Sequence, residues 1–178
     1  RLIAQLFIYS PSGAVRDTTG FKRGVKRREK LGHQVEVDPS ALDKYQRFAG
    51  DDATRLQAIA RAAQSGADVA LMTRGGYGLT RILPQIDYAS IAQAIAKGTQ
   101  FVGLSDFTAL QHALLAQHPH AITWAGNLLV ADWGQVAAPD EITQACFEEM
   151  LDGSSEGAGW YVSAKVAQSE PNVQIENA

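Results

Sequence analysis

The stretch QFVGLSDFTALQHAL, residues 100–114, changes in its middle from one kind of local structure to another. Residues 101–104 form a short apolar run of good strand formers, whereas residues 107–114 place their apolar side chains at helical spacing. Ser105 therefore stands at a strand-to-helix turn, where a hydroxyl points outward at the positive end of a helix. A chain built from such units is predicted to form an α/β fold.

Ser105 fits two interpretations. In a nucleophile elbow a serine occupies this turn and presents its hydroxyl for catalysis, and Gly103 would leave the necessary room. The sequence G-x-S-D, however, lacks the second glycine of the usual G-x-S-x-G pattern. Serine is also a common N-cap, and Asp106 can itself cap the following helix by accepting a backbone N–H. This stretch alone leaves a structural cap and a catalytic serine open.

The same alternation of strand and helix extends along the chain on both sides. Further strands are predicted at residues 2–9, 33–37, 67–73 and 121–124, and further helices at residues 15–31, 51–64, 88–96 and 139–151. Strands that alternate with helices imply right-handed crossovers and a doubly wound, mostly parallel sheet with helices on both faces. Flavodoxin-like and Rossmann-like domains have this architecture.

Four segments follow directly after predicted strands: PSG at 11–13, RGGYG at 74–78, Ser105, and WAGN at 124–127. A parallel sheet binds its ligands at the carboxyl ends of its strands. We therefore expect these segments to converge on one rim of the sheet.

The glycines of RGGYG (74–78) allow three interpretations. The segment invites comparison with phosphate-binding loops, but neither G-x-x-x-x-G-K-[ST] nor G-x-G-x-x-G is present. The glycines could serve only a tight turn. Alternatively, a backbone N–H of this turn and the N–H of Asp106 could point at one oxyanion beside the Ser105 hydroxyl.

Composition excludes several classes of protein. The 178 residues suffice for one ordinary domain, and a formal net charge of −3 argues against nucleic acid as a partner. The one basic cluster, within residues 22–30, is predicted to be a solvated helix face. No apolar run approaches the roughly 20 residues of a membrane span.

Metal and cofactor sites are not expected either. Cys146 is the only cysteine, which excludes an internal disulfide and a thiolate metal site and fits a reducing compartment. The four histidines show no H-x-x-x-H or H-E-x-x-H spacing.

The two ends of the chain suggest a fragment. The chain starts at Arg1 with no initiator methionine, and the pattern of elements weakens after Gly153. We expect an α/β domain at residues 1–152, followed at 153–178 by a linker or the start of a further domain.

Several motifs together resemble one family. These are PSG (11–13), YQRFAGDD (45–52), RGGYG (74–78) and GLSDFTAL (103–110), and their order and spacing match as well. They resemble the LD-carboxypeptidases, the muramoyl-tetrapeptide carboxypeptidases, over about residues 2–135. The combination of R-G-G-Y-G with G-x-S-D-x-T-A-L is specific rather than generic, so the resemblance favours the catalytic interpretation of Ser105.

The resemblance implies a cytoplasmic serine peptidase that acts in peptidoglycan recycling. Its nucleophile would be Ser105, and the backbone N–H groups of Gly76 and Asp106 would form the oxyanion hole. Tyr77, Trp124 and Asn127 would contact a murein peptide that ends in D-alanine, although the family often has a His-Gly-Pro-like stretch where this chain has residues 125–127. The family's activating glutamate and histidine come from a C-terminal domain beyond residue 178, so this chain alone would be inactive. A homodimer is a further partner to consider.

Two alternatives remain. Some relatives resemble immunity enzymes that cleave peptide–nucleotide antibiotics, which would keep the fold and change the substrate. A non-catalytic ligand-binding module, in which Ser105 is only a helix cap, would change the class of protein.

Overall fold

A single five-stranded sheet, parallel throughout, organises the computed structural model, which describes residues 3–154. Its strands are β1 (Gln5–Tyr9), β2 (Gln34–Val37), β3 (Val69–Met72), β4 (Gln100–Gly103) and β5 (Trp124–Ala125). They lie in the order β2-β1-β3-β4-β5, which is the flavodoxin-like order of doubly wound proteins. The predicted fold class is therefore confirmed.

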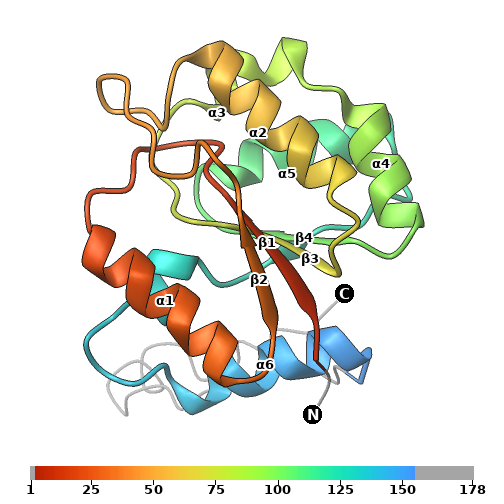
Figure 1. The fold of residues 1–178 in the computed structure, drawn as a ribbon. Helices are drawn as coiled ribbons and strands as arrows, with labels where there is room; N and C mark the ends of the chain where they lie inside the picture. The colour runs from red at the N-terminus through yellow and green to blue at the C-terminus, as the bar shows by residue number, and fades with distance from the viewer. Residues whose placement is uncertain (1–2, 155–178) are drawn as a thin grey trace, which may run out of the picture.

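Helices cover both faces of the sheet (Figure 1). They are α1 (Thr18–Lys30), α2 (Asp52–Gln64), α3 (Leu79–Ile82), α4 (Tyr88–Ala96), α5 (Phe107–Gln117) and α6 (Glu141–Asp152), with short turns η1 (Leu83–Gln85) and η2 (Leu129–Trp133). In Figure 1, α2, α4 and α5 lie on one side of the strands, and α1 and α6 lie on the other.

The strand side chains alternate between two separate cores, because successive residues of a strand point to opposite faces. Phe7 and Tyr9 of β1 belong to the core under α2, α4 and α5. Leu6 and Ile8 of the same strand belong to the core under α1, η2 and α6. The central strands β1, β3 and β4 are thus buried and apolar on both faces, whereas the edge strands β2 and β5 are mostly exposed.

Aspartates start four of the six α-helices found within residues 3–154. The carboxylates of Asp17, Asp51, Asp87 and Asp140 each accept a hydrogen bond from the backbone N–H three residues later. This N-cap satisfies an N–H that has no partner within the helix. The capping pattern explains why α1 begins at Thr18, three residues after the predicted start.

The basic cluster on α1 is not the solvated face that was predicted. Arg28 is fully buried, and its guanidinium lies 3.5 Å from the centre of the Trp133 ring and 4.7 Å from that of Phe147. A guanidinium can be buried in this way because its planar faces stack well on aromatic rings. Arg28 therefore joins α1 to η2 and α6.

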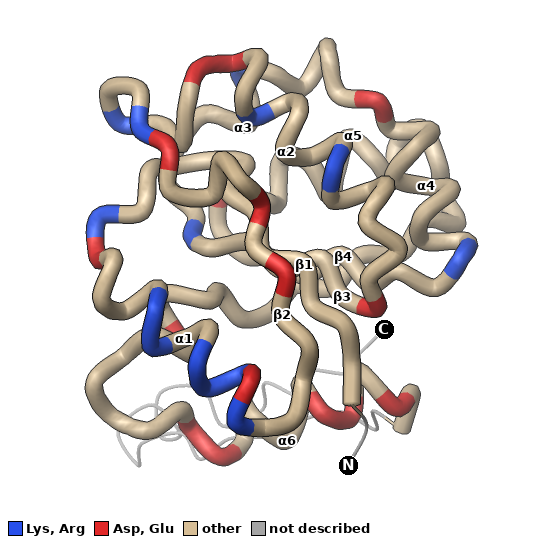
Figure 2. The backbone as a smooth tube through the Cα atoms, viewed as in Figure 1, with Lys and Arg blue, Asp and Glu red and all other residues tan. Residues whose placement is uncertain are grey.

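Two further arginines of α1 bind backbone carbonyls of the segment 133–136. Arg27 donates to the carbonyls of Trp133 and Gln135 at 3.0 and 2.7 Å, and Arg23 donates to that of Gly134. The lysines of the cluster are exposed, and together with the arginines they give α1 the blue segments seen in Figure 2. The prediction of solvation is correct for the lysines and wrong for Arg28, while Arg23 and Arg27 are half-buried.

The last predicted elements need small corrections. The strand expected at 121–124 is the two-residue β5, so Trp124 lies within the strand and not after it. Helix α6 ends at Asp152, where Gly153 adopts the left-handed conformation of a helix C-cap. Most of the expected linker, residues 155–178, lies outside the described residues.

None of the helices within residues 3–154 has the length and apolar character needed to cross a membrane.

Candidate active site

Ser105 lies between the end of β4 and the start of α5, as the sequence predicts. Its φ is +67°, in the left-handed region, and the residue is exposed. A residue other than glycine in this region stores roughly 1–3 kcal/mol of strain. The turn therefore has the strained backbone and outward side chain of a nucleophile elbow.

Close packing beneath the elbow explains its glycine. A Cβ on Gly103 would lie only 2.5 Å from Cγ of Phe107 and 2.6 Å from Sδ of Met72. Phe107 is fully buried at the first turn of α5. The absent side chain at position 103 lets the Phe107 ring pack against the strand, and this packing fixes the angle at which α5 leaves the sheet.

The glycine turn 74–78 packs directly against Ser105. A Cβ on Gly75 would lie 2.9 Å from Cβ and 3.0 Å from Oγ of Ser105, so only glycine allows this approach. The expected contact between the turn and the serine is confirmed. Among the described residues, neither Gly76 nor Asp106 donates its backbone N–H to another group. Both N–H groups are free to bind a ligand oxygen, and their role in an oxyanion hole stays a prediction.

Asp106 does not cap its own helix, contrary to the prediction. Its φ and ψ are −56° and −26°, so its backbone is already helical, whereas an N-cap residue needs an extended conformation to turn its carboxylate back to the helix N–H groups. Its Oδ2 instead accepts hydrogen bonds from the Ser12 hydroxyl at 2.5 Å and from the N–H of Leu79 at 3.0 Å.

The loops after β1, β3 and β4 meet at this point, as expected for one rim. The N–H of Gly13 donates to the carbonyl of Gly75 at 3.2 Å, and the Ser12 hydroxyl lies 3.4 Å from the Tyr77 carbonyl. Local sequence patterns identified the PSG turn, but they gave no sign that Ser12 joins the two other loops. Ser12, whose side chain is buried, is therefore a site residue that the sequence analysis missed.

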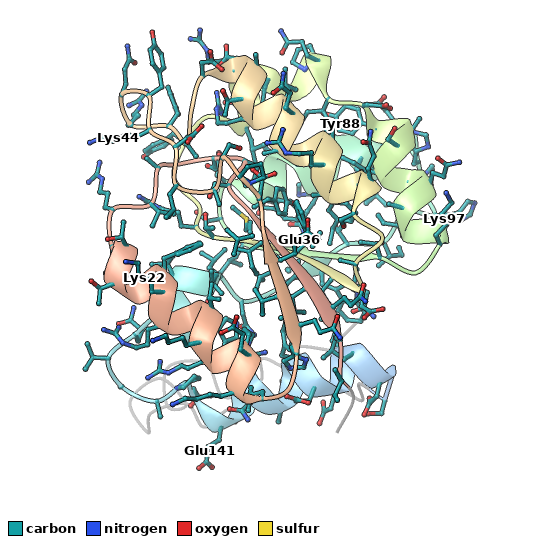
Figure 3. All side chains as sticks on the ribbon, in the orientation of Figure 1. Lys22, Glu36, Lys44, Tyr88, Lys97 and Glu141 are labelled. Carbon is teal, nitrogen blue, oxygen red and sulfur yellow. The ribbon has the colours of Figure 1, made fainter. Side chains whose placement is uncertain are left out.

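A positive charge lies on the same rim. The Arg47 guanidinium lies 5.2 Å from the centre of the Phe48 ring and 5.6 Å from that of Tyr77. Arg47 is exposed and belongs to the loop between β2 and α2, which Figure 3 marks with Lys44. A ligand beside Tyr77 would therefore meet a cation.

The three predicted substrate contacts lie in different settings. Tyr77 is 71% exposed on the glycine turn, and Trp124 is 37% exposed on β5, where it pairs with Val102 of β4. The Asn127 amide donates to the Thr143 carbonyl of α6 at 3.4 Å, so it already has a structural partner. The substrate roles of all three residues stay predictions.

No histidine within residues 3–154 is hydrogen-bonded to Ser105. His112 lies two turns along α5, and His118 and His120 follow at the end of that helix. His33 is buried at the opposite end of the sheet, where its Nδ1 accepts the N–H of Ala4 at 3.2 Å. The described residues also contain no group of three or more side chains arranged to hold a metal ion.

The fold places a strained, exposed serine at the carboxyl end of a strand in an α/β sheet. Residues 6–126 match the family model of the LD-carboxypeptidase N-terminal domain. This chain belongs to that peptidase family, and the resemblance inferred from its motifs is confirmed.

Individual relatives agree with this assignment. A muramoyltetrapeptide carboxypeptidase of Oxalobacter formigenes has 30% identity and a TM-score of 0.71 over 82% of this chain and 47% of its own. An MccF-like protein of Bacillus anthracis has 25% identity and a TM-score of 0.75 over 85% of this chain and 45% of its own. A Streptomyces coelicolor protein that is named as a carboxypeptidase is 32% identical to this chain over 114 residues, which are 62% of this chain. The chain spans about 36% of that relative and less than half of the solved structures.

Proposed function

We propose that this chain is the nucleophile-bearing part of a serine-type LD-carboxypeptidase. The observation that carries the proposal is the exposed Ser105 at positive φ, packed against a glycine turn with free N–H groups. Family membership supports a peptidase, and the name of the Oxalobacter relative supports a murein peptide substrate. The bond cleaved would join the L-centre of a diamino acid to a terminal D-alanine.

The reaction proceeds by acyl transfer. Ser105 Oγ attacks the scissile carbonyl and gives its proton to a base, and the carbonyl oxygen becomes an oxyanion between the N–H groups of Gly76 and Asp106. Each such donor contributes roughly 3 kcal/mol in serine proteases. The C–N bond then breaks, the amine of D-alanine leaves with a proton, and water hydrolyses the acyl-enzyme.

The substrate's free carboxylate suits the charge of this rim. A carboxypeptidase must recognise the terminal carboxylate, and the exposed Arg47 guanidinium beside Tyr77 is a suitable counter-charge. Tyr77 and Trp124 are exposed aromatic residues that can contact the peptide. Asn127 would contribute only if a substrate displaces its bond to Thr143.

The general base lies outside residues 3–154 in this proposal. A base must come within about 2.6–3.2 Å of the nucleophile, and no described histidine is bonded to Ser105. We propose that a glutamate and a histidine from a further domain complete the site, and that the full-length enzyme works in cytoplasmic peptidoglycan recycling.

Fluorophosphonate labelling of the full-length protein tests the serine. We expect labelling of the wild type, none of Ser105→Ala, and unchanged labelling of the control Ser90→Ala, which alters a half-buried serine in the first turn of α4. A folded full-length protein without any labelling would instead indicate a non-catalytic module.

A second substrate class is favoured by the likeness to the MccF-like protein of Bacillus anthracis, since MccF itself is named a microcin C7 self-immunity protein and has been solved with aspartyl sulfamoyl adenosine. Under this alternative the same serine cleaves an amino acid from a nucleotide-like antibiotic. Turnover of a murein tetrapeptide should be compared with that of an aminoacyl sulfamoyl adenosine on the same enzyme. A higher kcat/KM for the second compound would replace the proposed substrate.

A further inference from the structure

We infer that the Asp106 side chain is a positioning residue, which holds the glycine turn 74–78 against Ser105 and so sets the separation of the two oxyanion donors. The inference rests on the proposed function, because it assigns these N–H groups to catalysis. It goes beyond that function by giving the carboxylate a role separate from that of its own backbone N–H.

A single oxygen atom makes both of the relevant bonds. Oδ2 of Asp106 accepts the N–H of Leu79 at 3.0 Å and the Ser12 hydroxyl at 2.5 Å. Leu79 is the first residue of α3 and directly follows the glycine turn. Gly78, the N-cap of α3, has no side chain to bond the free N–H groups of that helix. The carboxylate from the next loop therefore takes the place of the missing cap.

The second bond brings in the loop after β1. Ser12 is fully buried, and its one proton can be donated to Asp106 or to the Tyr77 carbonyl 3.4 Å away. The carboxylate is nearer and charged, so it is the stronger acceptor. Ser12 also precedes Gly13, whose N–H binds the Gly75 carbonyl at 3.2 Å. The glycine turn is thus held at both of its ends.

The position of the turn matters for the reaction. Gly76 lies between these two attachments, and the N–H of Asp106 is part of the residue that makes one of them. Catalytic donors must be placed to within a fraction of an ångström, and a displacement of 1 Å can cost about 100-fold in rate. Loss of the attachment should therefore lower kcat while leaving substrate binding nearly unchanged.

Hydrogen bonding, and not negative charge, should be the property that matters. A carboxylate beside a developing oxyanion is electrostatically unfavourable, because like charges repel. An asparagine could offer its amide oxygen to both Ser12 and Leu79 without that charge. The conservative variant should consequently restore the function that alanine removes.

The test measures kcat and KM of the full-length enzyme on a murein tetrapeptide ending in D-alanine. We expect Asp106→Ala to lower kcat about 100-fold with little change in KM, and Asp106→Asn to stay within about tenfold of wild type. Ser12→Ala should lower kcat about tenfold, and the double variant S12A/D106A should be no worse than Asp106→Ala, because the residues act as one unit. Asp87→Ala is the matched control, since it removes a similar carboxylate cap from α4 and should leave kcat unchanged.

Three results would overturn the inference. One is a kcat of Asp106→Ala close to wild type in an enzyme that Ser105→Ala inactivates. The second is an Asp106→Asn variant as slow as Asp106→Ala. The third, which applies even where Asp106→Ala does not fold, is an unchanged kcat in Ser12→Ala. Full activity of Ser105→Ala would instead refute the proposed function itself, so the two failures are distinguishable.

Discussion

Ser105 is strained because its neighbours on both sides are fixed. Phe107 is buried against Gly103 of β4, and the glycine turn lies against the serine, so the backbone of the turn has little room to relax. The left-handed conformation that results is unfavourable for serine and ordinary for glycine. Stability and catalysis should therefore conflict at this position.

Ser105→Gly should consequently stabilise the protein while it removes the nucleophile. Relief of roughly 1–3 kcal/mol of strain exceeds the 0.5–1 kcal/mol that a glycine costs, so the free energy of unfolding should rise by about 1 kcal/mol. Urea unfolding measures this change, with Ser105→Ala as the control that keeps the strain. Equal stability of the glycine and alanine variants would show that the turn is not strained.

Tyr9 is a second residue that lowers the stability of the fold, in this case through a buried polar group. It is fully buried at the end of β1, and its hydroxyl has no hydrogen-bond partner in the described structure. Burial raises the pKa of this phenol far above its ordinary value. Since an unpaired buried hydroxyl costs free energy, Tyr9→Phe should raise the unfolding free energy by about 1 kcal/mol. A loss of stability in thermal melts would reveal a partner for the hydroxyl.

At the scale of elements, an ion pair between the buried Asp38 and the half-buried Arg61 links the loop after β2 to α2. Both oxygens of Asp38 accept hydrogen bonds from Arg61, at 2.6 and 3.0 Å. Burial alone would raise the pKa of this carboxyl, but the bonds from Arg61 and Ser40 outweigh it and lower the pKa below its ordinary value. The pair therefore favours the folded state wherever Asp38 is ionised.

This pair predicts a component of acid sensitivity. The stability that Asp38 contributes is complete above its unfolded pKa of about 3.9 and is lost as the pH falls through its lower folded pKa. Asp38→Asn should be less stable near neutral pH, and its unfolding free energy should fall less steeply below about pH 4. The unfolding free energies of variant and wild type should be measured by urea unfolding between pH 2 and pH 6. An equal dependence on pH for the two proteins would contradict this account.

Elements could be predicted from the sequence where local signals sufficed. Residues 100–114 contain a short apolar run typical of a strand and then apolar residues at helical spacing. The positions of β4, α5 and Ser105 follow from this pattern. Asp106 shows the limit. Its partner Ser12 is 94 positions away in the sequence, and no local pattern distinguishes a cap of its own helix from an acceptor for another loop. The burial of Arg28 was missed for the same reason, since Trp133 arrives from a distant segment.

At the scale of the whole molecule, the proposed separation of nucleophile and base can be tested directly. The 178-residue chain and the full-length enzyme should be assayed side by side on a murein tetrapeptide. We expect the shorter chain to fold but to show at least about 100-fold lower turnover, because a positioned base contributes typically 10²–10⁴-fold. Comparable turnover would refute an external base and direct attention to His112, His118 and His120.

The hydrogen bonds from Arg23 and Arg27 to the segment 133–136 also bear on synthesis. Arg27 binds the carbonyl of Val136, which is 109 positions later in the chain. At 5–20 residues per second, the acceptors leave the ribosome roughly 5–20 s after the helix does. For that interval Leu6 and Ile8 of β1 lack the part of their core that η2 and α6 supply, so this core stays incomplete on the nascent chain. This face of the sheet is therefore the part of the protein that a chaperone has the longest opportunity to bind.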